Sequence, residues 1–301
     1  MDHYIGRFAP SPTGPLHFGS LVAATASYLQ ARHFGGSWLL RIEDLDPPRE
    51  VPGATDEILS TLEAYGFSWD GEVLYQSLRK DIYQLALDKL MAGGLIYPCA
   101  CTRSEIADSN LEGPHGPIYP GTCRNGLPPG RAPRALRVRS AGSSIDFNDL
   151  LYGPRHHNLA TEVGDFVVRR ADGLFAYQLA VVIDDAQQGV TEVVRGSDLL
   201  DSTPRQIHLQ RLLGLATPSY LHVPVAVNTQ GEKLSKQTGA RSVRRDSPVE
   251  TLCAVLKFLG QNPPSTLEEA DLDALWRWAL AHWDITRLAP SRQLNVDDPG
   301  C

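Results

Sequence analysis

Two segments far apart in the sequence carry residues that could bind a nucleoside triphosphate. In "HFGS", residues 17–20, His17 and Gly19 lie just before a segment with helical periodicity. The start of a helix offers unpaired N–H groups and partial positive charge to a phosphate, histidine can donate to it, and glycine allows close approach. In "KLSK", Lys233 and Lys236 bracket a serine and could neutralise phosphate charge. Taken alone, these segments also fit a hydrogen-bonded core or surface histidine and an ordinary exposed loop.

Clustered cysteines form a second chemical feature. Cys99, Cys101 and Cys123 lie in a stretch rich in proline and glycine, whereas Cys253 and Cys301 stand alone. Three thiolates suit a structural zinc site, which takes four ligands. The Cys-x-Cys spacing is tighter than that of most zinc sites, so a short redox pair is the alternative. An odd number of cysteines fits poorly with a disulfide framework.

Composition narrows the class of protein. The chain has 301 residues, of which 42% are hydrophobic and 21% charged, as expected of a soluble globular protein with two domains. It has no apolar run near the roughly 20 residues that cross a bilayer. The first residues show no signal peptide, so we expect a cytoplasmic protein with no membrane partner. The net charge of −7 argues against indiscriminate coating of nucleic acid but leaves room for local arginine clusters, at residues 124–139 and 241–245.

The order of the predicted elements indicates an α/β fold. Residues 4–10 predict a strand, and residues 20–34 an amphipathic helix with Ser20 as its N-cap and Gly35 at its end. Another strand and helix follow, which favours a parallel sheet. Periodicity is lost over residues 97–134, as in an inserted subdomain. Further expectations are strands over 134–140, 165–186 and 189–196, a helix over 202–214 capped by Ser202, and short C-terminal helices with an apolar stripe of Trp276, Leu280 and Trp283.

With their surroundings, these segments resemble the class I aminoacyl-tRNA synthetases. "HFGS" and "KLSKQ" stand where that family has its ATP motifs, HIGH and KMSKS, and "RFAPSPTG", "RIEDLDPPR" and "VVRGSDLLDSTPRQ" look like its glutamyl/glutaminyl branch. The resemblance implies a Rossmann-like parallel sheet with a zinc-bearing insertion and a small helical C-terminal domain. The implied domains are the first half of the catalytic domain at 1–96, the insertion at 97–175, the second half at 176–228, and the KMSKS-like loop with the helical domain, without an anticodon-binding domain, at 229–301.

Two departures point to one group within this branch. Ser20 replaces the last histidine of HIGH, and only 65 residues follow Lys236. Both traits resemble the short paralogues known as glutamyl-queuosine tRNA(Asp) synthetases. That resemblance implies an enzyme that activates L-glutamate with ATP in the absence of tRNA, then transfers it to the queuosine base at the wobble position of tRNA(Asp). The alternatives are a truncated glutamyl-tRNA synthetase that charges the 3′ end, a non-catalytic RNA-binding relative and a nucleotidyltransferase.

The resemblance also implies roles for single residues. Glutamate has two carboxylates and one ammonium, so we expect Glu43 to bind the amino group and Arg7 and Arg195 to bind the carboxylates, in either order. Asp44, Asp46 and Arg49 are expected to support Glu43. The fourth zinc ligand implied is Tyr119, with His115 as the alternative. The implied sites are Arg7, Phe8, Ala9, Pro10, Ser11, Glu43, Tyr177 and Arg195 for glutamate; His17, Gly19, Ser20, Lys233 and Lys236 for ATP with its Mg²⁺, with His17 and Lys236 catalytic; and Cys99, Cys101, Tyr119 and Cys123 for structural zinc.

The role of Lys236 gives a direct prediction. A cation that stabilises the charge developing at the α-phosphorus contributes mainly to the transition state. We expect Lys236→Ala to slow glutamate-dependent exchange of pyrophosphate into ATP by about 10²–10³-fold. Exchange at the wild-type rate in this variant would exclude the role.

Overall fold

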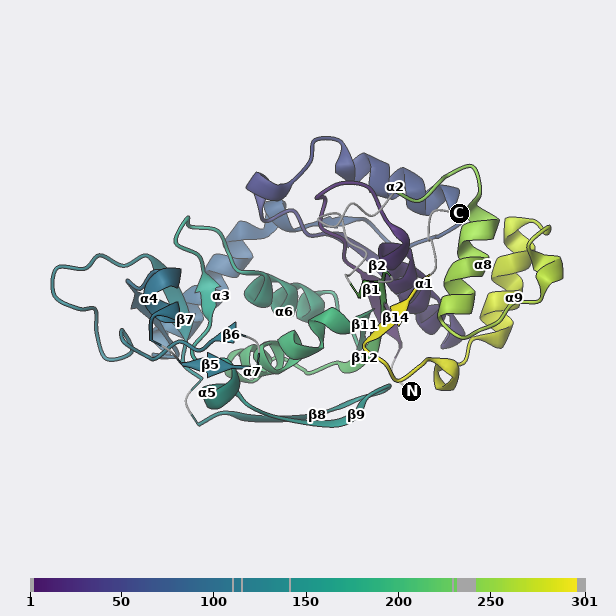
Figure 1. The fold of residues 1–301 in the computed structure, drawn as a ribbon. Helices are drawn as coiled ribbons and strands as arrows, with labels where there is room; N and C mark the ends of the chain where they lie inside the picture. Colours follow the sequence, from purple (N-terminus) through teal and green to yellow (C-terminus); the bar gives the residue numbers. More distant parts are fainter. Residues whose placement is uncertain are drawn as a thin grey trace.

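The computed structural model describes residues 3–109, 111–114, 116–140, 142–228, 230–231 and 242–296. Figure 1 shows the central sheet and its helices between two outer parts, one with α4, α5 and β5–β7 and the other with α8 and α9. The helices are α1 Phe18–His33, α2 Ala54–Ala64, α3 Lys80–Ala92, α4 Arg103–Ala107, α5 Leu159–Glu162, α6 Tyr177–Gln187, α7 Thr203–Leu213, α8 Pro248–Phe258 and α9 Leu272–His282, with the 3₁₀ helices η1 Pro47–Arg49, η2 Gln76–Arg79, η3 Ser197–Ser202, η5 Ser265–Leu267 and η6 Ile285–Arg287. The strands are β1 Ile5–Phe8, β2 Ser37–Ile42, β3 Leu74–Tyr75, β4 Ile96–Cys99, β5 Glu112–Gly113, β6 Gly116–Pro117, β7 Ala135–Val138, β8 Ser144–Asp149, β9 Gly153–Asn158, β10 Val167–Arg169, β11 Glu192–Gly196, β12 Ser219–Val223, β13 Val225–Val227 and β14 Gln293–Asn295.

Parallel strands form the centre of the molecule. β1 pairs with β2, β2 with β3, and β11 with β12, all in parallel. The two groups join beside β1, where the Thr191 N–H donates to the Ile5 carbonyl at 2.9 Å and Arg7 Nη1 donates to the Val194 carbonyl at 3.4 Å. Since β1 and β11 therefore run in the same direction, the carboxyl ends of these strands share one edge, where α/β sheets bind ligands.

The predicted helix over 20–34 is confirmed as α1, but it is buried on almost every side, so its predicted amphipathic character is wrong. The sheet covers one side, while α8 and α9 contact another. The helix begins one turn earlier than predicted, because His17 is its N-cap and accepts the Ser20 N–H on Nδ1 at 3.3 Å. Ser20 lies in the first turn, and its predicted capping role is wrong. The predicted end is confirmed, since Gly35 follows the helix with a φ of 63° that favours glycine.

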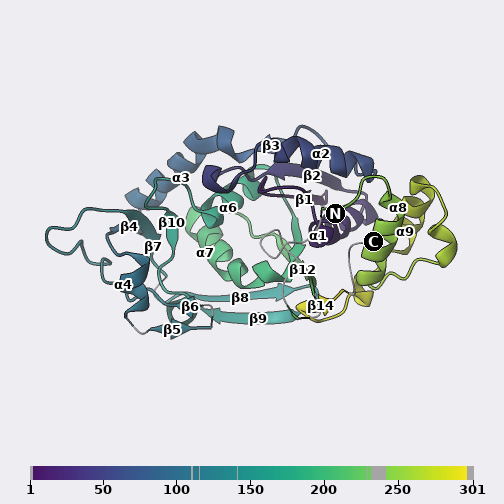
Figure 2. The same cartoon turned by 45° about the horizontal axis from the view of Figure 1, so that its top comes forward.

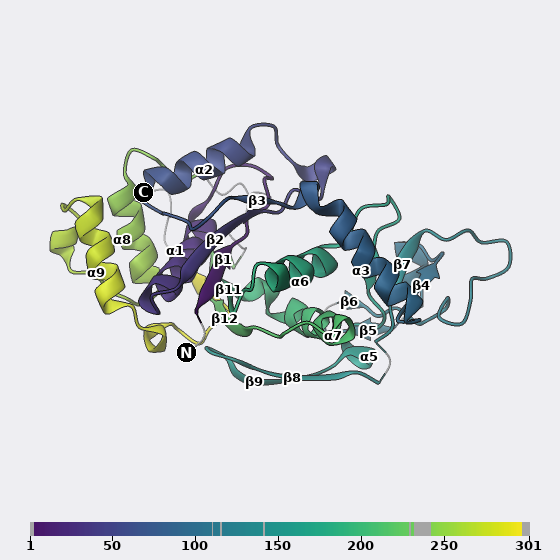
Figure 3. The ribbon, with the colours of Figure 1, turned by 180° about the vertical axis from the view of Figure 1, so that it is seen from behind.

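The insertion and the C-terminal helices lie at opposite ends of the molecule (Figures 1 and 3). In the insertion, β4, β7 and β10 form an antiparallel sheet. The β8–β9 hairpin runs from there beneath α7 back to the central strands (Figure 2), where Asp149 pairs with Tyr220 of β12. At the other end, Trp276 and Trp283 are buried against the α1 region, so the predicted apolar stripe is core. No helix in the described ranges is long and apolar enough to span a membrane.

One segment has a different structure from the one predicted. Residues 165–186 were expected to be strands, but only β10 is a strand and α6 follows it. Leu179 to Asp185 are all buried, so no polar face marks the helical period in the sequence. Ser202 does precede α7 as predicted, but its hydroxyl accepts from Gln178 Nε2 at 3.1 Å and caps no backbone N–H.

Candidate active site

A cleft of about 770 Å³ opens at the carboxyl edge of the parallel strands. Lys233 and Lys236 lie outside the described residues. Beyond them, Ser242 forms a β-bridge with His17 and the Val243 N–H donates to the Leu16 carbonyl at 3.0 Å, so residues 242–243 lie beside two residues that line the cleft. The cleft is lined by all of the predicted glutamate and ATP residues that the structure describes, namely Arg7, Phe8, Ala9, Pro10, Ser11, His17, Gly19, Ser20, Glu43, Tyr177 and Arg195.

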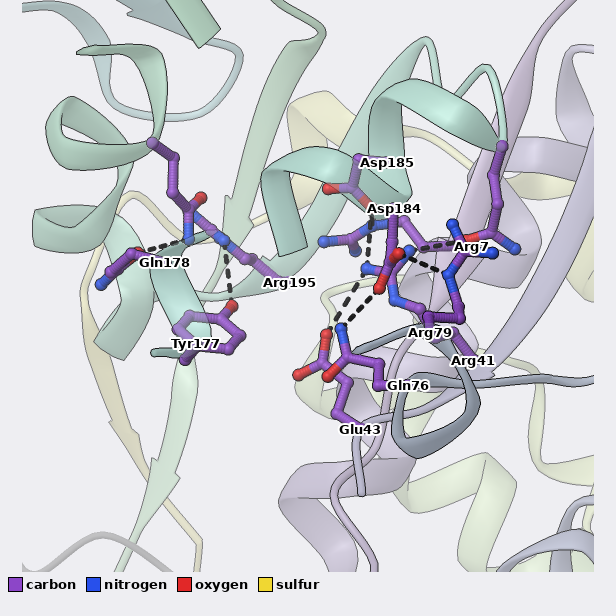
Figure 4. Close-up of polar contacts among 12 residues, drawn as sticks. Arg7, Arg41, Glu43, Gln76, Arg79, Tyr177, Gln178, Asp184, Asp185 and Arg195 are labelled. Carbon is purple, nitrogen blue, oxygen red and sulfur yellow. Dashed lines mark hydrogen bonds and ion pairs between the residues drawn. The ribbon is translucent and has the colours of Figure 1, made fainter. Parts of the chain in front are cut away.

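Asp185 joins two buried arginines beneath this cleft (Figure 4). Its Oδ1 accepts from Arg7 Nε at 3.1 Å and from Arg41 Nη2 at 2.7 Å. Arg41 also pairs with Glu43 at 3.4 Å. Two guanidinium groups and two carboxylates therefore balance in a region where an unpaired charge would be costly. Sequence reasoning missed Arg41 and Asp185, although charged residues inside the apolar stretches "WLLRIE" and "LAVVIDDA" were the available signal.

Glu43 contributes a buried carboxyl group to the cleft. Burial raises its pKa to about 7, although Arg41 and Arg7 act in the opposite direction. Its side chain contacts Arg41, and no hydrogen bond or ion pair among the described residues joins it to Asp44, Asp46 or Arg49. Support of Glu43 by these three residues through the backbone stays a prediction. Asp44 instead accepts from the backbone and hydroxyl of Ser77, at 2.8 and 2.6 Å. Asp46 pairs with Arg49 and, at 3.1 Å, with Arg170.

Arg195 lies in a different electrostatic setting. Its Nε donates to His222 Nε2 at 3.0 Å, its Nη2 to Thr203 Oγ1 at 2.8 Å, and its Nη1 to the Tyr177 hydroxyl at 3.4 Å. His222 Nδ1 lies 2.6 Å from Asp149 Oδ2. Burial lowers the pKa of His222 to about 4, so the ring is neutral at pH 7. Arg195 thus contacts neutral groups, whereas Arg7 contacts a carboxylate; sequence reasoning missed His222 and Asp149.

The cysteine cluster lies in the insertion and fits a metal ion. The Sγ atoms of Cys99, Cys101 and Cys123 are all within 4.8 Å of one another, and those of Cys101 and Cys123 are 3.7 Å apart. Sulfur ligands at about 2.3 Å around a tetrahedral zinc would lie about 3.8 Å apart, which matches this spacing. The Tyr119 hydroxyl is 3.4 Å from Cys99 Sγ and 3.8 Å from Cys101 Sγ. His115 lies outside the described residues.

Arginines of the insertion hold this cluster in place. The Arg137 guanidinium lies 4.0 Å from the centre of the Tyr119 ring, and its Nε donates to Cys99 Sγ at 3.3 Å. Arg124 pairs with the buried Asp165 at 2.8 Å. Arg137 thus contacts the cluster directly, and its cation beside Cys99 would offset the charge of clustered thiolates.

The second arginine cluster is only partly described. Arg244 pairs with the exposed Asp246 at 3.0 Å, and Arg245 donates to Thr61 Oγ1 at 3.2 Å. Arg241 lies outside the described residues. The two described arginines of this cluster therefore already have partners within the protein.

Comparison with known proteins identifies the family. The family described as "tRNA synthetases class I (E and Q), catalytic domain" matches residues 5–269. A glutamyl-Q tRNA(Asp) synthetase of Aromatoleum aromaticum is 59% identical over 297 residues, which are 99% of this chain and 93% of that protein. The chain belongs to the glutamyl-Q tRNA(Asp) synthetase family.

Other matches agree with this assignment. A glutamyl-Q tRNA(Asp) synthetase of Geobacter sulfurreducens is 57% identical over 289 residues, 93% of this chain and 92% of its own length. The solved glutamate-tRNA synthetase of Elizabethkingia anophelis aligns with a TM-score of 0.81 and 26% identity over 98% of this chain and 68% of that one. These matches confirm the family resemblance that the sequence predicted. They also confirm the ligase class and the α/β synthetase fold with its parallel sheet.

Proposed function

We propose that this synthetase forms glutamyl-adenylate from L-glutamate and ATP without tRNA, then transfers glutamate to the queuosine base at the wobble position of tRNA(Asp). The observation that carries the proposal is the charge pattern of one cleft. Two buried guanidinium groups, of Arg7 and Arg195, and the buried carboxylate of Glu43 complement the two carboxylates and one ammonium of glutamate. The similar proteins are glutamyl-Q tRNA(Asp) synthetases, which favours this activity over charging of a tRNA 3′ end.

Arg7 and Arg195 differ in the partners that they already have. Arg7 already has a carboxylate partner in Asp185, at 3.1 Å. Arg195 is almost fully buried among neutral groups, so a substrate carboxylate would supply its counter-charge. Glu43 is the group proposed to bind the ammonium.

Activation needs positioning and charge stabilisation rather than a covalent enzyme intermediate. A glutamate carboxylate oxygen forms a bond to the α-phosphorus of ATP as the bond to pyrophosphate breaks. Because His17 Nδ1 accepts the Ser20 N–H, its neutral ring carries the proton on Nε2, which is able to donate to a phosphate oxygen. Lys236 is the second proposed stabilising group, and Mg²⁺ arrives with ATP.

The experiment has two stages. Pyrophosphate exchange that depends on glutamate and needs no RNA is expected first. Transfer of labelled glutamate to tRNA(Asp) that contains queuosine, and not to the same tRNA without it, is expected next. Exchange that requires tRNA, together with transfer to the 3′ end of tRNA(Glu), would instead establish the truncated glutamyl-tRNA synthetase, and absence of both reactions would exclude a synthetase.

The buried state of Glu43 predicts a pH dependence. Its carboxyl must be ionised to bind an ammonium, and its pKa is about 7. The KM for glutamate is therefore expected to rise as the pH falls below 7, by up to about tenfold per pH unit. Initial rates of exchange between pH 6 and 8.5 measure this. Glu43→Gln should bind glutamate weakly at every pH, and a wild-type KM that is equal at pH 6 and 8 would contradict the role.

The cysteine cluster is proposed to hold one structural zinc ion with Tyr119 as the fourth ligand. Freshly purified protein is then expected to contain about one equivalent of zinc, and Cys123→Ala to lose most of it. Cys253→Ala is the matched control, because Cys253 is also buried but lies in helix α8, outside the cluster. Elemental analysis that finds less than half an equivalent in the wild type would exclude the site.

A further inference from the structure

Three side chains from distant segments form a buried hydrogen-bonded chain behind the cleft. Asp149 ends β8 of the insertion, His222 lies on β12, and Arg195 lies on β11. Their exposed fractions are 1%, 0% and 5%. Asp149 Oδ2 lies 2.6 Å from His222 Nδ1, and His222 Nε2 lies 3.0 Å from Arg195 Nε. These three side chains are separate from the Asp185 cluster, and the proposed function uses only Arg195 among them.

The partners fix the position of the imidazole proton. An arginine side chain can only donate, so His222 Nε2 must accept and carries no proton. The ring proton therefore lies on Nδ1 and is donated to Asp149. Asp149 Oδ1 accepts the N–H groups of Leu151 and Tyr152, both at 3.0 Å, so this carboxylate is itself held by the backbone.

We propose that Asp149 and His222 are positioning residues, which orient Arg195 toward a substrate carboxylate by holding the imidazole in this single tautomer. A neutral acceptor fixes the guanidinium without neutralising it, which a directly bound carboxylate would do. The ring of Tyr220 stacks on His222 with centroids 6.1 Å apart and restrains its plane. The inference rests on the proposed function, in which Arg195 binds glutamate.

The decisive variant is Asp149→Asn. The asparagine oxygen would keep the two backbone N–H groups, so its amide nitrogen would face His222 Nδ1 as a donor. The ring would then accept at Nδ1 and carry its proton on Nε2, directly opposite the Arg195 N–H. We expect the KM for glutamate in pyrophosphate exchange to rise about 10- to 100-fold, the effect of losing one charge-assisted hydrogen bond. The KM for ATP should stay within about twofold of that of the wild type.

A matched control lies on the same hairpin. Asp146 Oδ1 is 2.6 Å from His156 Nδ1, but both side chains are exposed and neither lines the cleft. Asp146→Asn should leave both KM values unchanged. A folded Asp149→Asn variant with a wild-type KM for glutamate would overturn the inference, as would equal increases in both KM values. A wild type that shows no glutamate-dependent exchange would instead overturn the proposed function.

Two substitutions of His222 keep the inference testable if Asp149→Asn does not fold. Glutamine can place an amide oxygen near the Nε2 position and accept from Arg195, whereas asparagine reproduces only the donor to Asp149. We expect His222→Gln to have a KM for glutamate at least about fivefold lower than that of His222→Asn. If His222 served only to stabilise the fold, the variant with the lower thermal midpoint would have the higher KM for glutamate. Equal KM values for the two variants would overturn the inference.

Discussion

Buried charge must be paired, and this requirement determines how the cleft is built. Asp185 on α6 contacts arginines of β1 and β2, which lie 178 and 144 residues away in the sequence. None of these groups could be buried at low cost without the others. The ion pairs therefore form only when β1, β2 and α6 come together, and the same contacts that close the fold also orient Arg7 and Glu43.

Arg195 shows the opposite solution to the same constraint. Its guanidinium donates to neutral acceptors, and one of these, His222, connects it to the carboxylate of Asp149. That carboxylate belongs to the β8–β9 hairpin, whose strand β8 pairs with β12 of the central sheet. This part of the chain thus does more than carry the cysteine cluster, because one of its strands takes part in the electrostatics of the cleft.

The sequence predicted the parallel α/β fold and the family, because these depend on local patterns such as "HFGS" and on strand–helix order. It did not predict the partners that set the state of each group. Asp149 and His222 are 73 residues apart, and no local pattern joins them. Burial also hides helical periodicity, which is why α6 was taken for a strand and α1 for an amphipathic helix. Ser20 was taken for the N-cap because serine caps helices often, whereas the His17 imidazole makes the bond.

The contrast between the two arginines bears on substrate selection. Under the proposed function, glutamate supplies a carboxylate to a guanidinium whose present partners are neutral. Glutamine has nearly the same shape but lacks the side-chain carboxylate, so in the orientation that places this carboxylate on Arg195, glutamine would leave the buried cation without a counter-charge. Sites that bind a group through a buried charge discriminate strongly against analogues that lack it, since the partner is left unpaired. The neutral groups around Arg195 would therefore weaken the binding of glutamine as well as orient glutamate.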